Sequence, residues 1–251
     1  QQNHHKLPDT LLDQPKINGL RAYIVWVDEI VGEGVFGSVV SRAKAISKEG
    51  NEYIVPHITK RFTKDMFTNN EIYDGELYVP NESLNMIKSR VPMQLASGTI
   101  TQPSLPVLPV QFWCFDLAVE DIPQLERLQR LHTIASNANW DFYNSNLSLY
   151  DTIYGSIVFT NYKIIDKRNA IECATLNISK GFEGSIVRAT DAPYGFGKRV
   201  SYAQKIKFKQ DKEFKIIDVI PKPNESETGM FVLLNDINVE TFKCNHIDSY
   251  K

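Results

Sequence analysis

Short runs of β-branched and aromatic residues, separated by polar segments, predict a chain built mainly from strands. Residues 22–27 (AYIVWV) form one such run, which is typical of a buried strand. The same pattern predicts strands at 22–31, 35–41, 71–79, 112–116, 153–164, 230–234 and 239–244. Between them, leucine and isoleucine recur at helical spacing in residues 121–137, with Glu126, Arg127, Gln129 and Arg130 on the expected solvated face. Further helical segments are expected at 57–70, 82–90 and 166–180.

The segments without periodicity are predicted to be peripheral. Residues 1–13 are polar, and we expect them to form a loose arm that carries His4 and His5. Residues 92–110 are rich in proline and predict a surface loop. Residues 221–228 combine proline, asparagine, serine and glutamate, which is typical of a linker before a final hairpin.

A glycine-rich segment, GEGVFGSV at residues 32–39, admits two interpretations. Taken alone, it matches the phosphate-covering loop of protein kinases. A kinase also needs a His-Arg-Asp catalytic loop and an Asp-Phe-Gly metal site, and the chain contains neither tripeptide. The segment lies between two predicted strands, so we expect a hairpin turn.

The composition is that of an ordinary globular protein. The 251 residues are 42% hydrophobic and 23% charged, and they allow one large domain plus part of another. No apolar run approaches the ~18 residues that a membrane helix needs, so we expect no membrane contact. The three cysteines are odd in number and lack metal-ligand spacing, which favours an intracellular protein over a secreted one.

Charge patterning places candidate binding chemistry in a few local patches. The net charge of −2 argues against a uniformly basic surface, so a nucleic acid would have to meet local basic patches such as residues 198–215. Lys205 and Lys207 lie two positions apart, where they share one strand face and repel each other unless an anion lies between them. The alternative is a basic edge strand that prevents aggregation.

Two further strands carry residues that suggest a site. Glu76 lies within a predicted buried strand, where a carboxylate needs a partner. Phe112 and Phe115 are three positions apart and cannot share a face of a regular strand, so one of them should face away from the core. Lys16 and Arg21 flank Gly19 just before the 22–27 run, which places both cations at the mouth of a sheet.

Five short motifs, taken in order, resemble those of the covalent nucleotidyltransferases, the family of DNA ligases and mRNA-capping enzymes. The nearest resemblance is to the small ATP-dependent DNA ligases of viruses and bacteriophages. The motifs are KINGLR (16–21), DGEL (74–77), FWCFD (112–116), EGSIVR (183–188) and KIK (205–207).

The resemblance implies an α+β fold, in which antiparallel sheets flanked by helices form a nucleotidyltransferase (ATP-grasp-like ligase) domain at 1–218. The start of an incomplete oligonucleotide-binding (OB) barrel would follow at 219–251. It also implies nick sealing with ATP through an AMP adduct on Lys16, with Mg²⁺ or Mn²⁺ as the metal. The expected partner is nicked double-stranded DNA, and the expected form is an intracellular monomer in a bacterial or virus-infected cell.

The resemblance assigns each motif residue a role. Lys16 would be the nucleophile, Phe115 would stack on adenine with Asp116 near the phosphates, and Glu183 would hold the metal. The 5′-phosphate of the nick would meet Arg42, Lys198 and Arg199. The nucleotide would be bound by Gln14, Arg21, Glu76, Phe115, Lys205 and Lys207.

Asn18 departs from the motif, which has aspartate at this position. Asparagine keeps the shape but loses the charge, so we expect lysine adenylylation to survive and the later steps to slow. Two alternatives therefore stay open beside the DNA ligase. One is an RNA ligase or GTP-dependent capping enzyme, and the other is a non-catalytic module that binds a nucleotide or nicked DNA.

Overall fold

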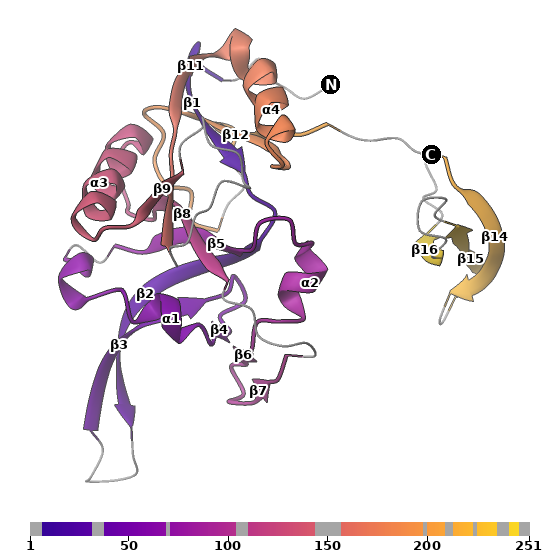
Figure 1. Ribbon diagram of the computed structural model, residues 1–251, viewed down its shortest axis with the longest axis horizontal. Coiled ribbons are helices and arrows are strands. Elements are labelled where there is room, and N and C mark those ends of the chain that lie inside the picture. Colours follow the sequence, from indigo (N-terminus) through magenta and orange to yellow (C-terminus); the bar gives the residue numbers. More distant parts are fainter. Residues whose placement is uncertain are drawn as a thin grey trace. The chain divides into compact units, whose positions relative to one another are not determined.

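The computed structural model describes residues 7–31, 38–68, 71–103, 110–143, 157–197, 200–208, 213–222, 225–234 and 241–245. The chain divides into two compact units, residues 1–207 and residues 208–251. Two sheets belong to the first unit and one to the second, and a few helices pack against them, which is a mixed α+β architecture (Figure 1). Within the described residues, no helix is both long and apolar enough to cross a membrane.

A nine-stranded sheet forms the body of the first unit, with the order β7-β6-β4-β3-β2-β5-β8-β10-β9. All seven residues of its interior strand β8 are buried. The strands are β2 (Leu20–Val31), β3 (Ser38–Ile46), β4 (Glu52–Tyr53), β5 (Tyr73–Tyr78), β6 (Met93–Gln94), β7 (Ile100–Thr101), β8 (Gln111–Leu117), β9 (Asp141–Tyr143) and β10 (Ile157–Thr160).

The expectation of purely antiparallel sheets is wrong at one end of this sheet. Strand β10 runs parallel to both β8 and β9. Parallel neighbours need a long crossover connection, and the chain from β8 to its parallel neighbour β10 includes helix α3 (Gln124–Asn137) and strand β9.

Helix α3 is amphipathic as predicted, but its buried face includes a charge. Leu128, Leu131 and Ala135 are fully buried. Arg127, which we expected on the solvated face, is 1% exposed because its guanidinium pairs with the buried carboxylate of Asp116. The hydrophobic core beside this helix is strongly aromatic, with Trp113 contacting Tyr78, Tyr143 and Phe182.

A second sheet of four strands has the order β11-β1-β12-β13, and helix α4 (Ala170–Ser179) packs against it. Its strands are β1 (Thr10–Lys16), β11 (Lys163–Asp166), β12 (Gly184–Ala189) and β13 (Ala203–Ile206). The prediction of a loose arm at 1–13 is therefore wrong from Thr10 onward. Leu11 and Leu12 are 0% and 1% exposed because β1 pairs with strands on both sides, while His4 and His5 lie outside the described residues.

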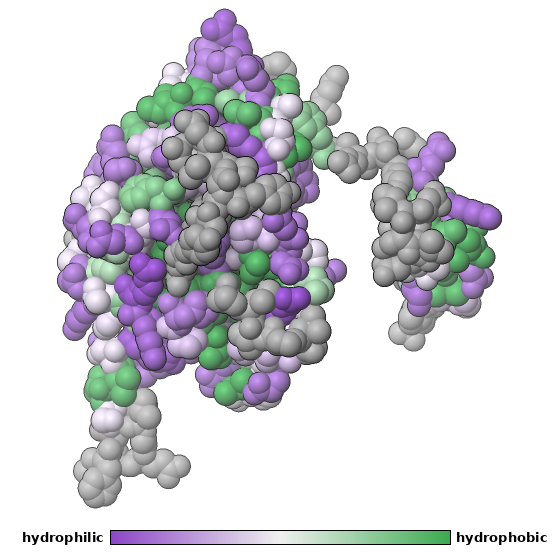
Figure 2. Space-filling view, in the orientation of Figure 1, coloured by the Kyte–Doolittle hydropathy of each residue, from purple (hydrophilic) through white to green (hydrophobic). Residues whose placement is uncertain are grey.

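The predicted hairpin at the glycine-rich segment is confirmed by the pairing of β2 with β3, which reaches Val31 and Ser38. The turn residues 32–37 lie outside the described residues. The hairpin projects from the lower end of the sheet in Figure 1. Figure 2 shows apolar atoms at the end of its described part, where Ile30 and Val39 are 77% and 67% exposed.

The predicted connections are partly right. In the segment predicted at 57–70, the described residues up to 68 form only two single turns, α1 (Pro56–Thr59) and a 3-10 helix (Lys64–Phe67). The helix predicted at 82–90 is α2 (Leu84–Lys88), and the helix predicted at 166–180 is a 3-10 turn (Lys167–Asn169) followed by α4. In the proline-rich loop, β6 and β7 pair as a short hairpin.

The second unit is a three-stranded antiparallel sheet with the order β14-β15-β16. Its strands are β14 (Lys215–Lys222), β15 (Glu225–Leu234) and β16 (Thr241–Asn245). The predicted hairpin at 230–244 is confirmed, but the linker predicted at 221–228 is wrong because Lys222 pairs with Glu225. The whole of β14 pairs within this unit, so the division between the units precedes the domain boundary expected at residue 218.

Candidate functional site

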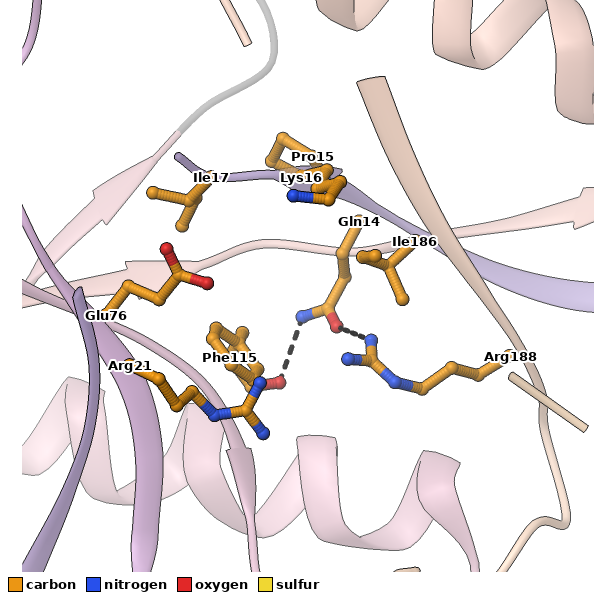
Figure 3. A pocket seen from close by; sticks show the side chains of 9 residues that line it. All are labelled: Gln14, Pro15, Lys16, Ile17, Arg21, Glu76, Phe115, Ile186 and Arg188. Carbon is orange, nitrogen blue, oxygen red and sulfur yellow. Dashed lines mark hydrogen bonds between the residues drawn. The ribbon is translucent and has the colours of Figure 1, made fainter. Parts of the chain in front are cut away.

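A cavity of about 190 Å³ lies between the two sheets of the first unit. Strands β1 and β12 supply one side, and β2, β5 and β8 supply the other. Figure 3 shows Lys16 across the cavity from Arg21 and Phe115. The cavity is lined by Gln14, Pro15, Lys16, Ile17, Arg21, Glu76, Phe115, Ile186 and Arg188. The fold thus brings five residues predicted for nucleotide chemistry to one place, although they are spread over the first half of the chain.

Lys16 lies at the end of β1 and forms an ion pair with Glu183. The other carboxylate oxygen of Glu183 accepts a hydrogen bond from the Lys207 ammonium at 2.7 Å, so one carboxylate joins two lysines. Partial burial acts to raise the pKa of Glu183, but the bonds from Lys16 and Lys207 outweigh it and hold this pKa below its usual value. Lys16 pairs with Gly184 of β12. Only glycine fits at position 184, because a Cβ there would lie 2.1 Å from the carbonyl oxygen of Ile206.

Glu76, on β5, binds the turn that follows Lys16. Its carboxylate accepts a hydrogen bond from the backbone N–H of Gly19 at 2.6 Å. Burial raises the pKa of Glu76, although this N–H and the charges of Lys16 and Arg21 act against the rise. Gly19 is required sterically, since a Cβ there would lie 2.5 Å from the carbonyl oxygen of Leu77.

Arg21 lies over the ring of Phe115, with its guanidinium carbon 4.7 Å from the ring centre. It forms an ion pair with Asp74, which also accepts a hydrogen bond from the Tyr194 hydroxyl at 2.6 Å. Burial acts to lower the pKa of Arg21, but the adjacent carboxylate outweighs it and raises this pKa. Arg21 is therefore a fixed cation at the edge of the cavity.

Phe115 lines the cavity and lies at an irregularity in the β5–β8 pairing. Asp74 pairs with Asp116 and Gly75 with Cys114, so Phe115 has no opposite residue, as in a β-bulge. Phe112 instead packs in the core against Phe62. The prediction that only one of the two phenylalanines faces the core is confirmed.

Gln14 is 1% exposed, and its amide is held by the protein. Its nitrogen donates to the carbonyl oxygens of Phe115 and Thr160 at 3.1 and 3.0 Å. Its oxygen accepts from Arg188 at 2.6 Å, as Figure 3 shows. Burial lowers the pKa of Arg188, and the nearby guanidinium of Arg21 acts in the same direction.

Several residues predicted for the site do not line the cavity. Arg42 donates to Glu52 at 2.6 and 3.1 Å and to Glu29 at 3.3 Å, so its guanidinium already pairs with carboxylates. Both oxygens of Asp116 bind Arg127, which places Asp116 in a buried ion pair. Lys205 is exposed on β13, while Lys198 and Arg199 lie outside the described residues.

Sequence reasoning did not single out Arg188 or Tyr194 as site residues. Arg188 could have been found from the alternation on β12, because Ile186 and Arg188 share the face that lines the cavity. Tyr194 lies in a segment between strands, and no local pattern points to its bond with Asp74. Among the described residues, no group of three or more histidine, cysteine, aspartate or glutamate side chains could hold a metal ion.

Among the comparisons with known proteins, only the comparison with solved structures finds similar chains. No protein-family model matches the chain, and no curated protein matches it. Among solved structures, a chain named Pmar-Lig_PreS3 superposes with a TM-score of 0.68 at 15% identity, over 98% of this chain and 55% of that one. The chain thus spans little more than half of that protein's length.

Two further solved structures are matched over more of their length. A Lig E DNA ligase matches with a TM-score of 0.62 at 18% identity, over 99% of this chain and 82% of that one. A Chlorella virus DNA ligase-adenylate matches with a TM-score of 0.56 at 17% identity, over 98% and 79%. The family resemblance of the five motifs is confirmed in the fold: this chain has the fold of the ATP-dependent DNA ligases.

Proposed function

We propose that the chain is the catalytic core of an ATP-dependent DNA ligase, which seals nicks through a lysine–AMP intermediate and a DNA-adenylate. One observation carries the proposal: Lys16 lies at a cavity with Arg21, Glu76 and Phe115, and its amine binds Glu183. A similar fold, the Chlorella virus enzyme, is a ligase-adenylate.

In the first step the Lys16 nitrogen attacks the α-phosphorus of ATP, the new N–P bond forms, and the bond to pyrophosphate breaks. The attacking amine must be uncharged, so the Lys16 ammonium has to lose a proton before attack. In the second step a 5′-phosphate oxygen of the nick takes the AMP group and the lysine is regenerated. In the third, the 3′-hydroxyl attacks that phosphate, the strand is joined and AMP leaves.

The cavity supports adenine over guanine. Both amide hydrogens of Gln14 are used by backbone carbonyls, so only a lone pair of its oxygen can meet a base. At position 6 of the ring, adenine presents an amino donor, whereas guanine presents a carbonyl acceptor. We infer that Gln14 accepts from N6 while Phe115 stacks on the ring and Glu76 meets the ribose.

The phosphates would lie on the lysine side of the cavity. Lys207 already binds Glu183 beside Lys16, and Lys205 lies two positions away on β13. A bound Mg²⁺ would neutralise phosphate charge, with Glu183 as its one carboxylate ligand and phosphate oxygens and water as the others. To meet a 5′-phosphate, Arg42 would have to exchange a carboxylate partner for it, and we propose Lys198 and Arg199 for the same phosphate.

We further propose that the three-stranded sheet of the second unit is the start of an OB barrel, a fold that has five strands. The first unit would then be the adenylation domain, and the protein would act on nicked double-stranded DNA as a monomer. The similar chains extend beyond the matched region, since even the Lig E ligase is covered over only 82% of its length.

The decisive experiment is intact-mass analysis after incubation with Mg²⁺ and ATP, GTP or NAD, with Lys16→Ala as the control. We expect an AMP adduct from ATP alone, and no adduct in the variant. A GMP adduct would move the assignment to a capping enzyme. An AMP adduct that persists in Lys16→Ala would exclude Lys16 as the nucleophile.

Asn18 supports a second candidate, a module that binds nicked DNA without turnover. Asn18 is exposed next to Lys16, and its amide lacks the charge of the aspartate expected in the motif. Tight binding of nicked DNA without any AMP adduct would favour this candidate.

A further inference from the structure

A second, larger hollow of about 950 Å³ lies beside the cavity in the first unit, and the two share Arg21. Its floor is one face of β2, where Arg21, Tyr23 and Val25 alternate. Residues 194–197 line it, and Lys48, just after β3, also contributes. We call this hollow the aromatic groove.

The aromatic side of the groove is already fixed in position. Phe196 is 42% exposed, and its ring centre lies 4.7 Å from that of Tyr194. Tyr194 is held by its hydrogen bond to Asp74 and by the Arg127 guanidinium, 5.5 Å from its ring centre. An exposed aromatic ring on a rigid support is a platform on which a base or sugar can pack without further ordering.

The charges of the groove favour an anion at one end only. Its lining, taken over the described residues, contains the cations Arg21 and Lys48 and no carboxylate. At the far end, Val25 and Ile72 also line a neighbouring hollow that contains acidic residues. These are Asp28, Asp65 and Glu71, which outnumber the single lysine, Lys64, among the described residues that line that hollow. A polyanion would be attracted near Arg21 and repelled beyond Val25, which limits its length in the groove.

We propose that the aromatic groove holds one strand of nucleic acid, with a base or sugar against Phe196 and Tyr23 and phosphates toward Arg21 and Lys48. This proposal rests on the proposed ligase function and deepens it, because it assigns a surface of the first unit to the DNA that the ligase would bind. From Arg21 to Val25 the strand β2 rises about 13 Å, at ~3.3 Å per residue. A duplex rises ~3.4 Å along its axis for each phosphate of one strand, so about four phosphates would pass the groove if the duplex axis ran parallel to β2.

The test is fluorescence anisotropy of a labelled nicked duplex over a range of salt concentrations, without ATP. Phe196→Ala should weaken binding about tenfold, as loss of one aromatic contact does, whereas Phe196→Tyr should bind as the parent chain does. Lys48→Gln should reduce the slope of log K against log salt by about 0.9, the effect of one lost phosphate contact. Lys60→Gln, an exposed lysine outside the groove, is the matched control and should leave the slope unchanged.

Intact-mass adenylylation of the same variants separates the two proposals. All four variants should form the AMP adduct as the parent chain does, because none of these side chains lines the cavity. Unchanged DNA binding in Phe196→Ala and Lys48→Gln would overturn the groove assignment, as would loss of the adduct in Phe196→Ala. If the parent chain forms no adduct but both groove variants still weaken DNA binding, the ligase function fails and the groove stands.

Discussion

The buried ion pair between Asp116 and Arg127 allows a quantitative test of what holds β8, the strand that carries Phe115, against helix α3. Asp116 is 3% exposed and Arg127 is 1% exposed. The guanidinium donates to Asp116 at 2.9 and 3.1 Å, to Gln124 at 2.6 Å and to the carbonyl oxygen of Ala192 at 3.0 Å. These bonds tie β8 to α3 and to the segment that leads to Tyr194.

Asp116→Asn leaves the Arg127 charge buried and turns an amide donor toward another donor. Breaking one partner of such a pair costs about 3–5 kcal/mol of unfolding free energy. For a unit of this size each kcal/mol lowers Tm by about 2–4 °C, so we expect a fall of roughly 10 °C. Replacing both partners, as in Asp116→Leu with Arg127→Met, should cost less than the two single changes added together, because no buried charge remains.

The assay is urea unfolding followed by tryptophan fluorescence. All three tryptophans, Trp26, Trp113 and Trp140, lie in the first unit, so the signal reports that unit alone. The exposed pair of Glu126 and Arg130 on the same helix supplies the control, and Glu126→Gln should change the unfolding free energy by less than ~1 kcal/mol. A loss below ~1 kcal/mol in Asp116→Asn, or strict additivity in the double variant, would refute this account of the pair.

Three further outcomes are expected. Burial raises the pKa of Asp13 in the folded chain, so Asp13 holds its proton to a higher pH in the folded state than in the unfolded state. The free energy of unfolding should therefore fall as pH rises from about 4, the unfolded pKa of Asp13, through its folded pKa. Asp13→Asn should flatten this pH dependence in urea titrations, and an unaltered profile would count against this role of Asp13. Glu183→Gln should slow AMP-adduct formation about a hundredfold or more in single-turnover mass measurements, because it removes the carboxylate that joins Lys16 and Lys207. A rate equal to that of the parent chain would contradict this role of Glu183. Asn18→Asp should speed sealing of a nicked duplex, measured on denaturing gels, and leave adduct formation little changed; equal sealing rates in the two proteins would show that the altered motif position is neutral.

The organisation of the fold brings residues of several motifs to one cavity. Lys16 and Gln14 lie on a strand of the smaller sheet, while Arg21, Glu76 and Phe115 lie on three neighbouring strands of the larger one. The short segment from Ile17 to Gly19 connects the two sheets, and Glu76 fixes it through the Gly19 N–H. A nucleotide in this cavity would therefore contact both sheets at once.

The amino-acid sequence alone determined the local elements with strong periodicity and the order of the motifs. The apolar run at 22–27, the aromatic strand at 112–116 and the amphipathic helix at 121–137 all lie where the pattern predicts them. These elements depend on residues close together in the chain, whose side-chain spacing matches the period of a strand or a helix. The odd step from Phe112 to Phe115 likewise predicted that one ring would leave the core.

Only the tertiary structure decided which polar residues are free to act. Residues 1–13 read as a polar arm, yet from Thr10 onward they belong to an interior strand because β11 and β12, more than 140 residues later, pair on both sides. Arg127 and Arg42 look like surface cations, but distant or cross-strand carboxylates bind them. A charge takes whichever partner the fold brings near, and its Coulomb energy depends on that distance and on burial, neither of which is written in the local sequence.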